Sequence, residues 1–62
     1  MELRELRERR GKTQREIAEY LGVSRSTYAR YEQDPDRLSI AQAELLCRLL
    51  KCSIDTIFPV ER

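Results

Sequence analysis

Two short helical segments joined by a glycine turn constrain this chain more than any other feature of its sequence. Residues 13–16, Thr-Gln-Arg-Glu, have the spacing of a capping box, which predicts that a helix begins at this point. Gly22 is placed to adopt the left-handed conformation that ends this helix, and Ser24 is placed to cap a second one. Residues 14–33 are therefore predicted to form a tight helical hairpin whose second helix projects from the surface.

Apolar residues at helical spacing predict three more helices around this hairpin. Leu3 and Leu6 indicate a first helix, which Gly11 ends. Ser39 and Ser53 are expected to cap a fourth helix and a last short turn. The other core-facing positions are expected to be Ile17, Ala18, Leu21, Tyr28, Tyr31, Ala43, Leu46, Cys47 and Leu50, and the last turn contains Ile54, Ile57 and Phe58. The chain is therefore predicted to be all-α, with five short helices.

Composition limits the classes of protein to which the chain can belong. Its 62 residues fit one small domain, residues 1–62, and the scarcity of Gly and Pro, two of each, argues against an all-β sandwich. No apolar run approaches the roughly 18–20 residues of a membrane helix, so we expect a cytoplasmic protein without membrane contact. The chain has no His, which removes the usual general base and argues against an enzyme.

The two cysteines, Cys47 and Cys52, are interpreted as small buried hydrophobic residues in preference to a disulfide. They lie five residues apart in a segment with helical spacing, and no secretory signal precedes them. A metal site would need more ligands than these two thiols offer, so no cofactor or metal is expected.

Charge is distributed unevenly along the chain, although the net charge is only +1. Residues 1–31 contain eight basic and five acidic side chains, whereas residues 32–62 contain four basic and six acidic ones. This polarity suits a domain with one face toward an anionic partner, and an ordinary solvated surface can also produce it.

The order of these motifs resembles the helix-turn-helix domain of the phage Cro/CI repressor family of bacterial and phage regulators. The matching pieces are Leu3-Arg4-Glu5-Leu6-Arg7, Thr13-Gln14 with Ile17-Ala18, Leu21-Gly22-Val23-Ser24, Tyr31-Glu32 and Leu50-Lys51-Cys52-Ser53-Ile54-Asp55. The resemblance extends from Leu3 to Phe58 and implies a lambda-repressor-like DNA-binding fold. Ala43 and Asp34 depart from it, at positions where the family usually has a leucine and a glycine.

The resemblance makes the second hairpin helix a recognition helix, whose outward residues meet base edges in the major groove. Arg25, Ser26 and Arg30 are the expected base-contacting residues, and arginine can form two hydrogen bonds with guanine. The residues expected to contact phosphates lie at helix ends or in the predicted loop at 33–37; they are Gln14, Ser24, Thr27, Gln33 and Arg37. For Ser24, a purely structural capping role is an equal alternative.

The family pattern also pairs an arginine of the first helix with the glutamate that ends the recognition helix. The corresponding residues are Arg7 and Glu32, and we expect them to form a structural ion pair. Tyr28 and Tyr31 are expected in the core with solvated hydroxyl groups, whereas Tyr20 is expected to be exposed.

The leading functional hypothesis is sequence-specific binding of double-stranded DNA by a transcriptional regulator, expected to be a repressor. The alternative is a protein-interaction module, such as an antitoxin or an accessory partner of a regulator. We expect a minimal regulator in preference to an excised domain. The expected DNA site has two-fold symmetry, and a weak homodimer is expected through the C-terminal residues Ile57, Phe58 and Val60.

Overall fold

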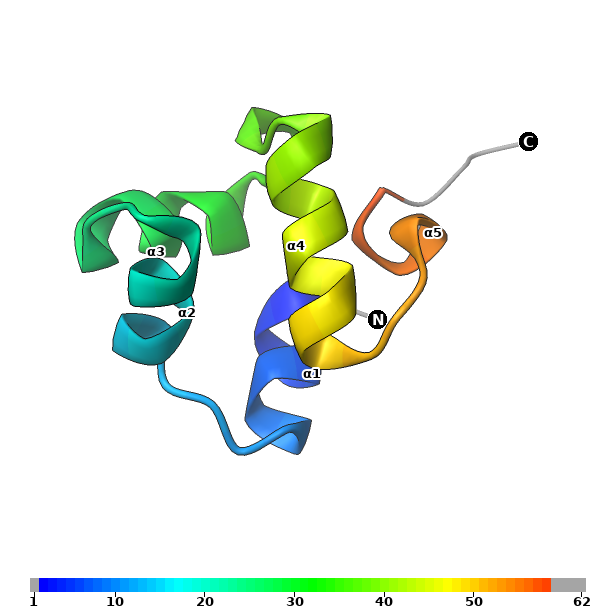
Figure 1. The fold of residues 1–62 in the computed structure, drawn as a ribbon, viewed down its shortest axis with the longest axis horizontal. Helices are drawn as coiled ribbons and strands as arrows, with labels where there is room; N and C mark the ends of the chain where they lie inside the picture. Colours follow the sequence, from blue (N-terminus) through cyan, green and yellow to red (C-terminus); the bar gives the residue numbers. More distant parts are fainter. Residues whose placement is uncertain (1, 59–62) are drawn as a thin grey trace.

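The computed structural model describes residues 2–58 of the chain. These residues contain five α-helices and one 3₁₀ turn (Figure 1). Their bounds are α1 (Leu3–Arg9), α2 (Gln14–Leu21), α3 (Arg25–Gln33), η1 (Pro35–Arg37), α4 (Ile40–Leu50) and α5 (Ile54–Ile57). The expected all-α class and the five helices are confirmed. The loop expected at 33–37 is shorter than predicted, because Gln33 belongs to α3 and Pro35 opens a 3₁₀ turn.

The helix boundaries follow from side chains that satisfy the free N–H groups of each first turn. Thr13 Oγ1 accepts from the Glu16 N–H at 3.1 Å, and Glu16 Oε1 accepts from the Thr13 N–H at 3.0 Å. Ser39 and Gln42 form the same reciprocal pair at the start of α4. Ser53 was expected to cap α5, but its side chain accepts no backbone hydrogen bond; its Oγ lies 3.3 Å from Thr56 Oγ1 instead.

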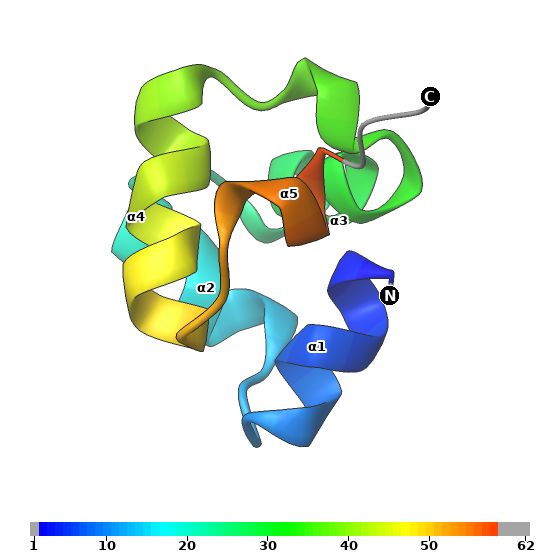
Figure 2. The same ribbon diagram turned by 90° about the vertical axis from the view of Figure 1, so that its right-hand side faces the viewer.

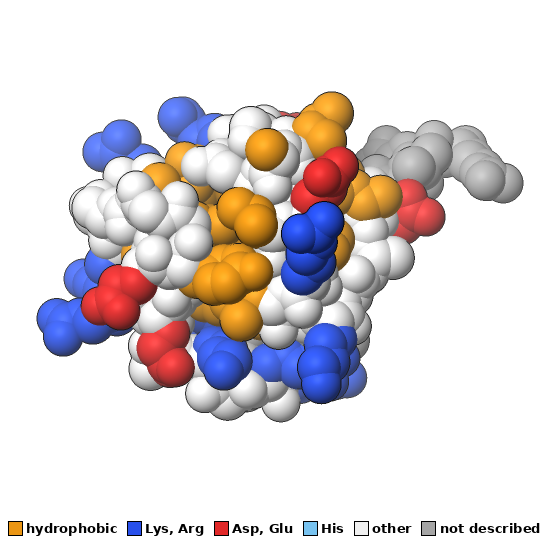
Figure 3. All heavy atoms as spheres, in the orientation of Figure 1, with side chains coloured by type: hydrophobic (Ala, Val, Ile, Leu, Met, Phe, Trp, Pro, Cys, Tyr) orange, Lys and Arg blue, Asp and Glu red, His pale blue; other side chains and the backbone are white. Residues whose placement is uncertain are grey.

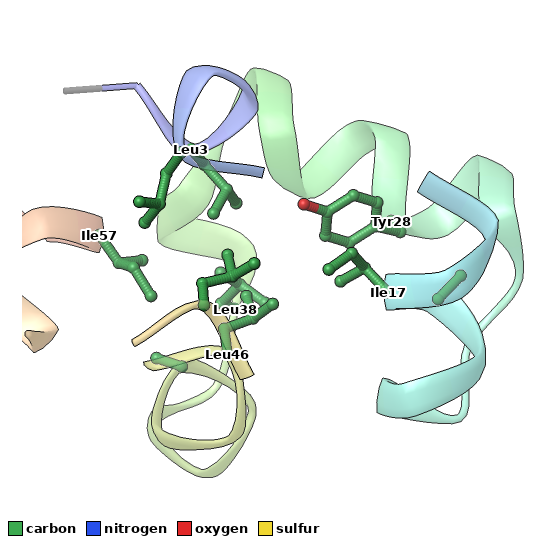
Figure 4. Packing of buried hydrophobic residues seen from close by; sticks show 10 residues of the cluster. Leu3, Ile17, Tyr28, Leu38, Leu46 and Ile57 are labelled. Carbon is green, nitrogen blue, oxygen red and sulfur yellow. The ribbon is translucent and has the colours of Figure 1, made fainter. Parts of the chain in front are cut away.

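The core lies where α1, α4 and α5 meet the inner faces of α2 and α3. In two perpendicular views, α2 and α3 lie on one side of α1 and α4, and α5 lies on the other (Figures 1 and 2). Figure 4 shows the side chains that fill the space between these elements. The buried residues are Leu3, Leu6, Ile17, Ala18, Tyr28, Leu38, Ala43, Leu46, Leu50 and Ile57. Burial of this apolar surface is the main favourable contribution to folding.

The position of Ile57 corrects the expected dimer surface. Its side chain is only 3% exposed and packs in the core near Leu3, so it is not available for contact with a second chain (Figure 4). Phe58 is half-buried and packs against the same cluster, and Val60 lies outside the described residues. The apolar residue that α5 does expose is Ile54, at 40%.

Candidate nucleic-acid interface

The turn between α2 and α3 has the conformation that its residues predict. Gly22 adopts φ 74° and ψ 29°, the left-handed region in which glycine has no steric penalty. The Val23 N–H donates to the Ala18 carbonyl at 3.0 Å, which closes the end of α2. Ser24 Oγ then accepts from the Thr27 N–H at 3.1 Å and begins α3. The two helices are thereby held at a fixed angle with only three residues between them.

The three residues expected to contact bases, Arg25, Ser26 and Arg30, are all exposed on α3. Ser26 and Arg30 are four residues apart and share one face of the helix, and Arg25 is the first residue of α3. The opposite face of α3 contains Tyr28, which is fully buried. Basic side chains gather along the edge formed by α2 and α3, with some acidic side chains among them (Figure 3). One face of α3 is therefore free to meet a partner, while the other is fixed to the core.

Gln14, the first residue of α2, links the two ends of α3, at Arg25 and Glu32, through its side chain. Its Oε1 accepts from Arg25 Nη1 at 3.0 Å, and its Nε2 donates to Glu32 Oε1 at 3.0 Å. Only this orientation of the amide pairs a donor with an acceptor at both ends. The contact was not expected from the sequence, which gave Gln14 a phosphate-binding role alone. Gln14 and Arg25 are the first residues of α2 and α3. Their contact depends on how the turn orients the two helices, which no local sequence pattern predicts.

Arg7 and Glu32 form the expected ion pair between α1 and the end of α3. Arg7 Nε lies 2.6 Å from Glu32 Oε2, and the two side chains are only 11% and 6% exposed. Arg7 Nη1 also donates to the carbonyl of Lys12 at 2.9 Å. Burial raises the pKa of Glu32, but hydrogen bonds from Arg7 and Gln14 outweigh it, so the net pKa lies below the ordinary value. The hydrogen bond to Glu32 correspondingly raises the pKa of Arg7.

Tyr28 corrects the expectation of a solvated hydroxyl group. The hydroxyl is buried and forms no hydrogen bond with a described residue, although it lies near the Glu32 carboxylate. Burial, followed by the negative charge of Glu32, raises the pKa of Tyr28 well above its usual range. The phenol therefore stays neutral. Tyr31 is half-buried, and its hydroxyl accepts from Gln42 Nε2 at 3.4 Å.

The remaining expected phosphate contacts fall into two groups. Ser24 and Thr27 are already engaged with each other, because Ser24 Oγ donates to Thr27 Oγ1 at 2.8 Å and caps α3. Gln33 and Arg37 are exposed at the other end of α3 and in η1. Arg37 Nε lies 3.5 Å from Asp34 Oδ2, an exposed pair that contributes little to stability and can exchange for a phosphate.

A hollow of about 800 Å³ lies between α1, the end of α3 and α5. Its polar lining mixes charges of both signs: Glu2, Arg4, Arg7, Glu8 and Glu32. In residues 2–58 no group of three or more His, Cys, Asp or Glu side chains is arranged to hold a metal ion. Nor does this part of the chain contain a helix long and apolar enough to cross a membrane.

Comparison with known proteins tests the family resemblance. The sequence model of the helix-turn-helix family matches residues 3–57, from the first residue of α1 to the last residue of α5. Neither the comparison with curated proteins nor that with solved structures gave a match. The family match confirms the resemblance noted in the sequence.

Proposed function

Because the chain belongs to the helix-turn-helix family of DNA-binding transcription regulators, we propose that it reads a specific double-stranded site with α3 in the major groove. The observation that supports this most directly is the two-sided environment of α3. Arg25, Ser26 and Arg30 are exposed together, while Tyr28 and Glu32 fix the same helix to the core. A rigid element with an exposed polar face is what readout of base edges requires. We further propose that it is a repressor, which would act by excluding other proteins from the DNA that it occupies.

The hydrogen bond between Gln14 and Arg25 gives the proposal a more specific form. An arginine that is already oriented loses less side-chain entropy when it forms two hydrogen bonds with guanine. Gln14 also lies in the first turn of α2, where the helix N-terminus favours an anion. We therefore assign Gln14 two roles, orientation of Arg25 and contact with a neighbouring phosphate.

Selection of binding sites from a random duplex library tests the proposal as a whole. The expected result is enrichment of one short sequence, bound with an affinity that falls as salt is raised. A chain that enriches no sequence and binds no duplex even at low salt would instead be the protein-interaction module. Retention of duplex binding without any sequence preference would refute base readout by α3.

Replacing Arg37 with alanine should weaken binding to all duplexes to a similar degree. A phosphate contact contributes to affinity without reading sequence, so the slope of log affinity against log salt should fall by about one. The measurement is a titration of the selected site and of an unrelated duplex at several salt concentrations. Arg48→Ala, an exposed arginine on α4, is the control and should leave the slope unchanged. An unaltered slope for Arg37→Ala would remove this residue from the interface.

A homodimer on a symmetric site is the proposed assembly, because one helix reaches only a few base pairs. The selected site should then be an inverted repeat with half-site centres about 10–10.5 base pairs apart. Since Ile57 is in the core, we place the contact at Ile54, the exposed first residue of α5. Ile54→Lys should leave the monomer folded but reduce cooperative occupancy of the two half-sites. Ile40→Lys, the same change at a residue that is 72% exposed on α4, is the control. A site without two-fold symmetry, bound by one chain in sedimentation, would contradict the dimer.

A further inference from the structure

The end of α4 brings the two cysteines of the chain together. Lys51 adopts a left-handed conformation, φ 54° and ψ 54°, and the next N–H, that of Cys52, donates to the Cys47 carbonyl at 3.0 Å. This is the hydrogen bond of a Schellman motif, in which the residue after the left-handed position contacts the side chain five residues earlier. Those two residues are Cys47 and Cys52. Both residues are half-buried and free of a disulfide, and the turn joins their backbones, which the sequence interpretation as two small hydrophobic residues did not include.

The backbone of this turn is held in place from outside. Arg10 Nε donates to the Leu50 carbonyl at 2.7 Å, and Arg10 Nη2 donates to the Lys51 carbonyl at 3.3 Å. Arg10 thus fixes the segment between the two cysteines against the end of α1. Both cysteines are half-buried at the edge of the core, free of any disulfide, and partly accessible to a small reagent. The turn lies where α4 joins α5, on the side of the fold away from α3 (Figure 1).

We propose that Cys47 and Cys52 are a reversible modification site, which a small-molecule disulfide such as oxidised glutathione converts into an intramolecular disulfide. Two features support this: a backbone hydrogen bond that joins the two residues, and a turn whose Leu50 and Lys51 carbonyls are held by Arg10. Disulfides need their Cα atoms within about 4.4–6.8 Å, and a turn closed by a direct backbone hydrogen bond keeps its end residues close. The proposal is independent of DNA binding.

The reaction is two successive thiol–disulfide exchanges. The thiolate of one cysteine attacks a sulfur of oxidised glutathione, which forms a mixed disulfide and releases one glutathione thiolate. The second cysteine, after loss of its proton, attacks the protein sulfur of the mixed disulfide and releases the second glutathione thiolate. The two protons lost by the cysteines are taken up by the two glutathione molecules. Burial and the neighbouring Cys47 thiol raise the pKa of Cys52 to about 11, which lowers the fraction of its reactive thiolate at neutral pH.

The test compares the native chain with the same chain in denaturant, each equilibrated with defined ratios of reduced and oxidised glutathione. After acid quenching and alkylation, mass spectrometry separates the dithiol, the glutathione adduct and the intramolecular disulfide. We expect the equilibrium constant for formation of the Cys47–Cys52 disulfide by glutathione to be about tenfold higher in the native chain than in the denatured one. By linkage, that factor corresponds to about 1.4 kcal/mol of added stability in the oxidised protein, and its melting temperature should rise accordingly.

Two single variants serve as controls. Cys47→Ser and Cys52→Ser should both stop at the glutathione adduct, and both should keep the helical circular dichroism of the parent. A closure constant in the native chain equal to or below that of the denatured chain would overturn the proposal, because the fold would then not pair the thiols. Formation of intermolecular disulfides in place of the intramolecular one would overturn it as well.

Discussion

Replacing Arg7 with alanine is expected to destabilise the domain by about 3–5 kcal/mol, because the change removes one partner of a buried ion pair. Glu32 would be left in a site where its side chain is 6% exposed, without its main partner. Arg7 also donates to the Lys12 carbonyl between α1 and α2, so the variant loses a link between these helices as well. A domain of this length has only about 5 kcal/mol or somewhat more of total stability. The measurement is urea unfolding followed by circular dichroism.

Arg4→Ala is the matched control for this prediction. Arg4 lies on the same helix and forms an ion pair with Glu8 at 3.7 Å, but the two side chains are 68% and 55% exposed. Water screens this pair, so its loss should cost no more than about 0.5 kcal/mol. Glu32→Gln provides a second variant with nearly the same shape, in case the alanine variant does not fold. Equal midpoints for Arg4→Ala and Arg7→Ala would contradict a structural role for the buried pair.

Acid pH offers an independent readout of the same ion pair. The pKa of Glu32 in the folded chain lies below its ordinary value of 4.5. A carboxylate with a lowered folded pKa contributes stability that is complete above the unfolded pKa and is lost as pH falls through the folded pKa. The stability difference between the parent and Glu32→Gln should therefore be greatest near neutral pH and should shrink below about pH 4.5. A difference that does not change with pH would show that the pair makes no electrostatic contribution.

The sequence predicted most of the fold because the fold depends largely on local features. The capping boxes at Thr13 and Ser39 and the left-handed Gly22 each involve residues within a few positions of one another, and all three are present. The apolar positions that recur at helical spacing, such as Ile17 and Leu46, are in the core. The prediction was weakest at the end of the chain, where α5 has only four residues. A helix this short shows too little periodicity to separate its core face from its exposed face, so Ile57 was placed on the wrong one.

The contacts between side chains distant in the chain were only partly predictable. The pairing of Arg7 with Glu32 came from the family resemblance, since 25 residues separate them and no spacing rule connects them. The hydrogen bonds of Gln14 with Arg25 and Glu32 were missed, because they depend on the angle at which α2 meets α3. The polar network that joins α3 to α1 and α2 thus depends on the tertiary structure. This network is also what makes the consequences of changing Arg25 predictable.

Arg25→Ala and Arg30→Ala should each weaken binding to the selected DNA site by about 1–3 kcal/mol. Each arginine is exposed on α3, so its removal costs the domain little stability, in contrast to the loss of Arg7. Part of the affinity lost in Arg25→Ala should depend on Gln14, whose Oε1 accepts a hydrogen bond from Arg25 Nη1 at 3.0 Å. In a double-mutant cycle with Gln14→Ala, we therefore expect a coupling of about 0.5–3 kcal/mol for Arg25 and none for Arg30.

The measurements that separate base readout from general attraction are affinities for the selected site and for a mutated site, at one salt concentration. Loss of a base contact reduces the ratio of the two affinities, whereas loss of a phosphate contact lowers both together. Arg25→Ala and Arg30→Ala should reduce the ratio, each at a different base position, while Arg37→Ala should leave it unchanged. If both α3 variants keep the full ratio with an unaltered melting temperature, α3 does not read the bases. The specificity of the domain would then have to come from DNA shape, sensed through the phosphate contacts alone.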